Sequence, residues 1–176
     1  DEYDLSLVSK DLGVKYEILN VDTKPYPCCR STHCVIDSAL KLRREYDINI
    51  DAIDKVIVET YHVGWMQCGA TEGSRNPTTP MEAKFSTPYT FAVAFLKGNI
   101  TLEDFKPKNI ADKCVRNLLN KVIVLPNDEF TNRYPEHWGC KTTVKLLDGK
   151  EYFVEVSDAL GSVYNPMSKK DIKNKV

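Results

Sequence analysis

The sequence has little net charge, no long apolar run and no repeated segment. Its 24 lysine and arginine residues nearly balance its 25 aspartate and glutamate residues, for a formal net charge of −1. Nucleic-acid-binding proteins usually carry a basic excess, so this balance argues against that class. No apolar stretch approaches the roughly 20 residues of a membrane-spanning helix, so we expect no membrane segment. With 176 residues and no internal repeat, one domain is expected.

Metal-ligand patterns are also scarce. The chain has only three histidines. Cys28, Cys29, His33 and Cys34 could bind a metal on paper, but they lack a second ligand pair at zinc-finger spacing, and we expect neither a metal nor a cofactor. A chain that is 42% hydrophobic does not need its six cysteines as disulfides. We therefore expect free thiols and a cytoplasmic protein.

What the chain does have is a distinctive stretch at residues 24–33, which combines two prolines, a lysine, two adjacent cysteines, an arginine and a histidine. The residue before each proline is pushed into an extended conformation, so residues 24–27 predict a stiff extended strap. An amphipathic helix is expected next, from Cys34 to Tyr46. Ser31 or Thr32 is a natural N-cap for that helix.

The charges beside this helix start suggest an anion site. The first N–H groups of a helix are unpaired and carry a partial positive charge. With Lys24 and Arg30 nearby, the local geometry suits a bound anion, most simply a carboxylate. The alternative, which the local pattern by itself favours because such caps are common, is a proline-rich lead-in to an ordinary capped helix with a solvated lysine.

A second lysine precedes a second helix start. Lys84 lies just upstream of Ser86 and Thr87, either of which can cap a helix whose first turn contains Tyr89. If the fold brings Lys24 and Lys84 together, the two helix starts form a small electropositive cradle with a phenol donor in it.

The remaining pattern predicts an α+β domain with a mainly antiparallel sheet and helices on one face. Asp148-Gly149 is a strong hairpin signal, and Gly98 and Ser168 are expected to end and to begin helices. Two segments without a period are expected to be irregular loops, residues 62–80 and 127–138. The expected strands are residues 15–19, 55–61, 122–125, 140–147 and 151–156, and further helices are expected after Thr87, at 110–120 and after Ser168.

Three segments together resemble the MmgE/PrpD family, which includes 2-methylcitrate dehydratase, cis-aconitate decarboxylase and iminodisuccinate epimerase. They are the Lys-x-Tyr-Pro element at residues 24–27, the lysine, short turn and Tyr-led alanine-rich helix at 82–94, and Asn-Pro-Met-Ser at 165–168 with Asp171 and Lys175 after it. The resemblance implies a large helical N-terminal domain and a smaller α+β C-terminal domain, the lid. Residues 1–176 look like the lid alone, so we expect one domain of a longer enzyme whose helical domain is absent here.

The resemblance also implies a function. Family members are cofactor-free lyases or isomerases of small polycarboxylates that remove a proton next to a carboxylate and then eliminate water, lose CO2 or reprotonate. The lid would supply carboxylate clamps, and the helical domain most of the general base, so we expect this chain to be inactive by itself. The implied partners are a small polycarboxylate, the helical domain and a second copy in a homodimer.

Two catalytic residues follow from the resemblance. Lys24 matches the family's active-site lysine, which meets a substrate carboxylate or the developing enolate-like charge. Tyr89 matches a pocket tyrosine, for which a donor or acid role fits. Lys84 is expected to bind substrate, or else to pair with Glu82 or Glu103 on the surface.

Three more residues are expected at the substrate. Cys28 and Cys29 lie beside a helix start, where a thiol pKa can be lowered, and a role as pocket wall is expected for both. His33 could act as a base, or be an ordinary histidine of a capped helix. Cys29 stands where the decarboxylase pattern has a histidine, which weakens a specific decarboxylase assignment.

A hypothesis of a different class stays open beside the lyase. The same helix starts could hold an anion or small molecule for regulation in a non-catalytic binding or protein-interaction domain of α+β type.

Overall fold

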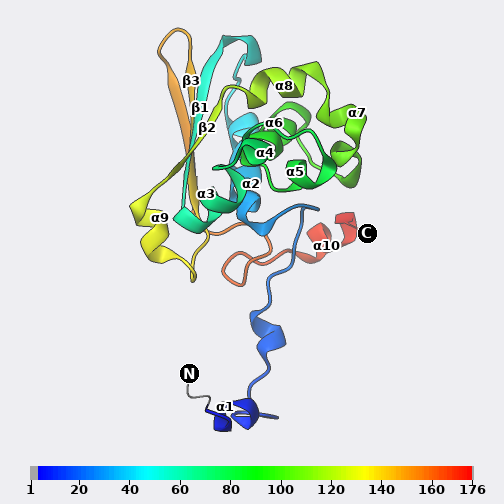
Figure 1. The fold of residues 1–176 in the computed structure, drawn as a ribbon, viewed down its shortest axis with the longest axis vertical. Coiled ribbons are helices and arrows are strands. Elements are labelled where there is room, and N and C mark those ends of the chain that lie inside the picture. Colours follow the sequence, from blue (N-terminus) through cyan, green and yellow to red (C-terminus); the bar gives the residue numbers. More distant parts are fainter. Residues whose placement is uncertain (1–3, 176) are drawn as a thin grey trace.

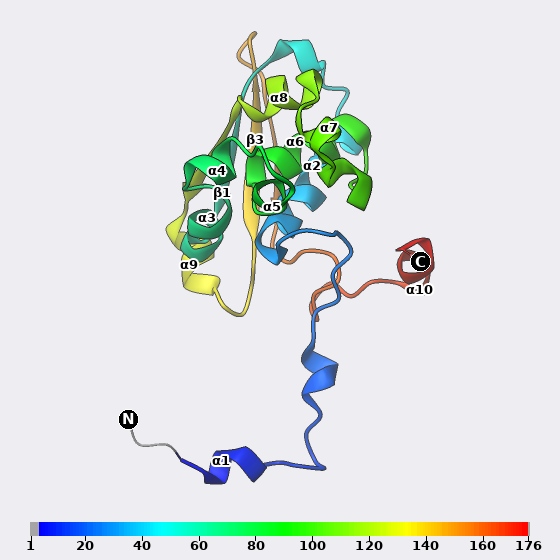
Figure 2. The same ribbon diagram turned by 45° about the vertical axis from the view of Figure 1, so that its right-hand side comes forward.

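The structure is a computed structural model that describes residues 4–175. The fold contains a four-stranded sheet in the order β2-β1-β3-β4. In Figures 1 and 2 the sheet lies on one side and most of the helices lie on the other. β1 runs parallel to β2 and antiparallel to β3, and β3 runs antiparallel to β4. The sheet is mixed and mostly antiparallel, which confirms the α+β class. The strands are β1 (Ile53–Thr60), β2 (Val122–Pro126), β3 (Cys140–Leu146) and β4 (Glu151–Val156).

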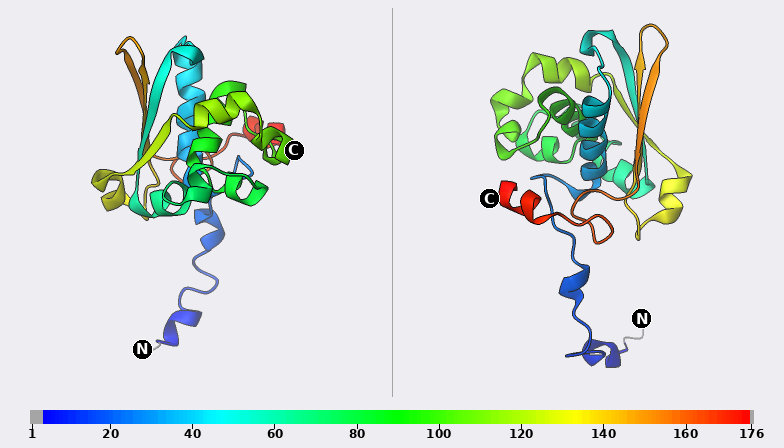
Figure 3. Two further views of the ribbon diagram at one scale, coloured as in Figure 1. Left: turned by 45° about the horizontal axis from the view of Figure 1, so that its top comes forward. Right: turned by 180° about the vertical axis from the view of Figure 1, so that it is seen from behind.

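Two helices cover one face of this sheet. α2 (His33–Glu45) packs on β3 and β4, and α6 (Thr87–Lys97) packs on α2, as the view from behind in Figure 3 shows. Alternate residues of β1, Val56 and Val58, point into this layer and are fully buried. On the opposite face Phe153 is 60% exposed. The period of two in the strands therefore separates a helix-covered face from an open one.

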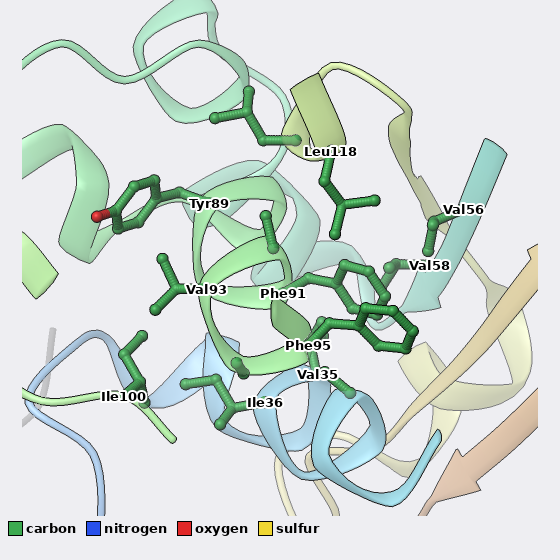
Figure 4. Close-up of a cluster of buried hydrophobic side chains, with 14 of the residues drawn as sticks. Val35, Ile36, Val56, Val58, Tyr89, Phe91, Val93, Phe95, Ile100 and Leu118 are labelled. Carbon is green, nitrogen blue, oxygen red and sulfur yellow. The ribbon is translucent and has the colours of Figure 1, made fainter. Parts of the chain in front are cut away.

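α6 is the central core helix. It is buried almost all round, and Phe91 and Phe95 stack with ring centroids 5.5 Å apart beside Val58 and Val35 (Figure 4). The helix ends at Gly98, whose φ of 75° is the left-handed conformation expected at a C-cap. Burying a helix on all sides needs cover beyond the sheet, and it comes from α2 and from α8 (Lys113–Leu119).

Several other local predictions are confirmed. Gly149 turns the β3–β4 hairpin with a φ of 87°. Ser168 caps α10 (Lys169–Lys175) by accepting the amide of Asp171 at 3.1 Å. Three further short elements are η3 (Ile50–Ala52), η4 (Leu102–Phe105) and α7 (Pro107–Ile110).

The prediction of an irregular loop at residues 62–80 is wrong. This stretch forms α3 (His62–Cys68), α4 (Glu72–Arg75) and the start of α5 (Pro80–Lys84). Helices of 7, 4 and 5 residues are too short to show a period of 3.6. α4 and α5 begin instead at capping boxes, made by Thr71 and Thr79. The second expected loop likewise contains a short helix, α9 (Asp128–Arg133).

The strand expected at residues 15–19 is also wrong. The described part of the first 22 residues is an arm that extends away from the sheet and contains only α1 (Ser6–Ser9) and the single 3-10 turn η1 (Glu17–Asn20) (Figure 2). Val14 is 82% exposed and Ile18 74% exposed. Alternation alone does not make a strand, because a strand needs a partner for its backbone hydrogen bonds.

All six cysteines are free thiols. Across residues 4–175, no helix is both long enough and apolar enough to cross a bilayer.

Candidate functional site

The proline strap is fixed at both of its sides. The Thr23 amide donates to the Gly161 carbonyl at 2.7 Å. The Tyr26 hydroxyl donates to Asp37 on α2 at 2.5 Å, and the other Asp37 oxygen accepts the Leu160 amide at 2.7 Å. Burial raises the pKa of Asp37, and its two hydrogen bonds oppose that shift. The strap is therefore held between α2 and the segment that follows β4.

Arg30 also joins the chain before the strap to the segment that follows β4. It lies in η2 (Arg30–Thr32), and its side chain is only 11% exposed. The guanidinium donates to Asp22, to the Leu160 carbonyl at 3.0 Å and to Nδ1 of His33 at 3.1 Å. With its donors used in this way, Arg30 organises the strap and is not free to meet a substrate in this structure.

Lys24 lies on the exposed edge of the strap. Its Nζ donates to the Cys28 carbonyl at 3.1 Å, which folds the side chain back along the strap. Its own carbonyl accepts from Lys175 at 2.5 Å, so the C-terminal helix α10 reaches the same place. The ammonium group keeps further donors, because a lysine has three.

The structure brings Lys84 to the same peptide. The Cys29 amide donates to the Lys84 carbonyl at 2.9 Å, which joins the strap to the end of α5. Both ammonium groups, Lys24 and Lys84, act on the Cys28 thiol and lower its pKa, against a larger rise caused by burial. Lys24 and Lys84 thus both lie near the Cys28-Cys29 pair, which the sequence by itself left as a condition on the fold.

Lys84 does not make the surface pairs that were the alternative. Glu82 instead accepts the amides of Thr78 and Thr79, and Glu103 pairs with Lys106 at 2.7 Å. The Lys84 ammonium lies 5.9 Å from the ring centroid of Phe105, a cation–π contact.

The two adjacent cysteines have opposite environments. Cys28 is buried, its thiol is 3.2 Å from the Thr32 hydroxyl, and burial raises its pKa to about 11. Cys29 is half-buried, and a hydrogen bond from the Cys68 thiol, with further hydrogen bonds from Ser31, lowers its pKa to about 6 despite desolvation. Cys29 is therefore largely a thiolate at neutral pH.

Tyr89 lies in the first turn of α6, as expected, but its side chain is packed in the core. The side chain is fully buried, and the hydroxyl donates to the backbone carbonyl of Asp104. In Figure 4 it extends from α6 away from Phe91 and Phe95. Burial raises its pKa, so the phenol stays protonated. A fully buried phenol bonded to Asp104 offers no surface to a hollow shared with Lys24 in this structure.

His33 is fully buried at the start of α2. Arg30 can only donate, so Nδ1 accepts and the neutral ring carries its proton on Nε2, which has no partner among the described residues. Burial, and then Arg30, lower the pKa of His33 to about 3. Thr32 is the N-cap residue, but its hydroxyl donates to the Cys29 carbonyl, so the side-chain cap predicted for this helix is not made.

A cavity of about 860 Å³ lies beside the strap. Lys24, Ile100, Glu103, Met167 and Lys175 are among its lining residues. Lys84 and Cys29 are outside the lining given by the described residues. Lys24 therefore borders both this cavity and the open surface where Cys29 and Lys84 meet.

Sequence reasoning missed the contribution of α3. The Ser31 hydroxyl donates to Gln67 at 2.9 Å, and Cys68 meets Cys29. Both residues fall in the stretch that was expected to be an irregular loop, and a helix of 7 residues gives no periodic signal that could have placed them. In the part of the chain that the structure describes, no three His, Cys, Asp or Glu side chains are grouped to hold a metal ion.

Two comparisons bear on this site. Residues 26–176 match the MmgE/PrpD C-terminal domain. The chain is also 24% identical over 160 residues to the cis-aconitate decarboxylase-like protein oryM of Aspergillus oryzae (strain ATCC 42149 / RIB 40). That match covers 85% of this chain and only 32% of the relative, so the chain spans about a third of the length of the curated protein it matches.

Proposed function

Because the chain belongs to the MmgE/PrpD family, we propose that it is the substrate-clamping lid domain of a cofactor-free lyase or isomerase of small polycarboxylates. The observation that carries the proposal is that the ammonium groups of Lys24 and Lys84 are both close enough to the Cys28 thiol to lower its pKa. Neither lysine forms an ion pair among the described residues, so both positive charges are available to a ligand.

Such a pair of cations suits the chemistry of the family. Removing a proton next to a carboxylate creates an enolate-like anion, and fixed positive charges lower the energy of that anion. Lys24 is the residue proposed to meet the developing charge, and Lys84 a second carboxylate of the substrate. Cys29 forms part of the wall between them.

The clamp is open on one side, which supports a site completed by another domain. Lys24 is exposed and Lys84 and Cys29 are half-buried. We propose that the helical domain expected for this family covers them and supplies the general base, and that the full-length protein is a dimer. The name of the relative favours cis-aconitate as a substrate to test, beside 2-methylcitrate.

The test is turnover of the full-length enzyme with Lys24→Ala. We expect kcat/KM for 2-methylcitrate or cis-aconitate to fall by about 100-fold to 1,000-fold, the usual effect of removing one group that stabilises a developing oxyanion. Lys55→Ala is the matched control, because Lys55 is exposed on β1 at the far side of the sheet. An unchanged kcat/KM in Lys24→Ala would remove Lys24 from the mechanism.

A further inference from the structure

Two pairs of cysteines meet in the fold. The thiols of Cys29 and Cys68 lie close enough for each to shift the pKa of the other, and so do those of Cys34 and Cys140. Of these four residues Cys29 alone is partly exposed, while the other three are buried. Only the first pair can be reached from solvent.

The first pair joins two separate elements. Cys29 directly precedes η2, and Cys68 is the last residue of α3. η2 packs against α3, and the residues next to the two cysteines are also joined, because the Ser31 hydroxyl donates to Gln67 at 2.9 Å. The packing of these elements therefore brings Cys29 and Cys68 together.

The two sulfur atoms of this pair differ in charge. Cys29 is a thiolate at neutral pH because it accepts hydrogen bonds from Cys68 and Ser31, with Lys24 nearby. Donating that hydrogen bond and being buried raise the pKa of Cys68, which keeps its proton. A thiolate is the form that attacks an oxidant, and an adjacent thiol can then resolve the product.

We propose that Cys29 and Cys68 form an oxidisable pair that hydrogen peroxide converts into a disulfide linking the segment after the strap to α3. In the first step the Cys29 sulfur attacks a peroxide oxygen: an S–O bond forms, the O–O bond breaks, and hydroxide leaves and is protonated to water. In the second step the Cys68 sulfur attacks the Cys29 sulfur: the S–S bond forms, the S–O bond breaks, and the proton of Cys68 leaves with the hydroxide as a second water. The two sulfurs together lose the two electrons that the peroxide gains.

The disulfide removes the negative charge beside Lys24 and tethers the strap to α3. Neither consequence depends on the proposed lyase activity, and the bond itself is detected without any substrate.

The test treats the purified full chain with hydrogen peroxide, blocks remaining thiols and maps tryptic peptides by mass spectrometry. Cleavage after lysine and arginine places Cys29 in residues 16–30 and Cys68 in residues 56–75. We expect a cross-link between these two peptides that dithiothreitol removes. The Cys34 peptide, residues 31–41, and the Cys140 peptide, residues 134–141, are the internal control and should stay unlinked.

Adjacent cysteines provide matched variants. Cys28→Ser should keep the cross-link, while Cys29→Ser and Cys68→Ser should each abolish it. Because Cys68 is fully buried and its variants are open to misfolding, the wild-type map is the primary result. A map that shows no link between the two peptides, a bond between Cys28 and Cys29 within residues 16–30, or equal linking of Cys34 with Cys140 overturns the proposal.

Discussion

The backbone amide of Cys29 donates a hydrogen bond to the carbonyl of Lys84 at 2.9 Å. This contact joins the proline strap to the end of α5, two segments far apart in the chain. Lys24 reaches the same place through its bond to the Cys28 carbonyl. The bond to Lys84 uses backbone groups only, so the Lys84 side chain can be changed in a test without removing this contact.

Lys84→Met tests the second cation of the clamp. Methionine keeps an unbranched apolar chain against Phe105 but removes the charge. We expect kcat/KM of the full-length enzyme to fall about 10-fold to 100-fold, mainly through KM, because the residue is proposed to hold a carboxylate of the bound substrate. Lys108→Met, at an exposed position of α7, should leave both constants unchanged. A Lys84 variant that behaves like the Lys108 variant contradicts the clamp.

Tyr89→Phe separates packing from catalysis. The variant leaves the buried carbonyl of Asp104 without its donor, so we expect a loss of about 1–2 kcal/mol in the free energy of unfolding. Since the hydroxyl is buried and bonded to the Asp104 carbonyl, kcat/KM should change less than about 3-fold. Tyr16→Phe, in the exposed arm, is the control for stability. A large loss of kcat/KM with unchanged stability would instead support the catalytic role that the family resemblance implies.

His33 should make the fold sensitive to acid. Its pKa in the folded chain is about 3, below the ordinary value of 6.5, so the unfolded chain binds a proton first as the pH falls. The stability that His33 contributes is complete above pH 6.5 and is lost as the pH falls towards 3, by at most about 1.4 kcal/mol per pH unit.

The measurement compares wild type with His33→Asn by urea denaturation between about pH 5 and pH 8. Asparagine has an oxygen that can accept from Arg30 and does not titrate in this range. We expect the wild-type free energy of unfolding to fall more steeply below pH 6.5 than that of the variant. Parallel pH profiles would show that His33 is not held neutral.

Gly161→Ala tests how the strap is docked. Gly161 and Gly149 both have positive φ, 86° and 87°, so alanine strains the backbone by about 1–2 kcal/mol at either position. Only at Gly161 would the new Cβ also clash, lying 1.9 Å from the Thr23 carbonyl oxygen, whereas at Gly149 it meets open space. We expect Gly161→Ala to be less stable than Gly149→Ala by a further 1–3 kcal/mol or so in thermal or urea unfolding. Equal losses would mean that the strap is not anchored at this point.

Much of the fold could be predicted because its signals are local. Gly98 and Gly149 supply the left-handed conformation that a helix end and a hairpin need, and Ser168 caps α10 with its own hydroxyl. The short helices α3 and α4 could not be found in this way, because their length gives no period and they are held by packing against their neighbours. The strand prediction for the arm was wrong for the opposite reason. Residues 15–19 alternate like a strand, but among the described residues no strand pairs with them.

The candidate site likewise has features set by the local sequence and features set by tertiary contacts. The sequence by itself determined the strap, the two lysines beside helix starts and the family to which these belong, since each depends on neighbours in the chain. Only the tertiary structure decided that Lys84 joins Lys24, that Tyr89 turns towards Asp104, and that Cys68 lies beside Cys29. Each of these contacts joins segments distant in sequence, and the packing of whole elements around α6 fixes which of them meet.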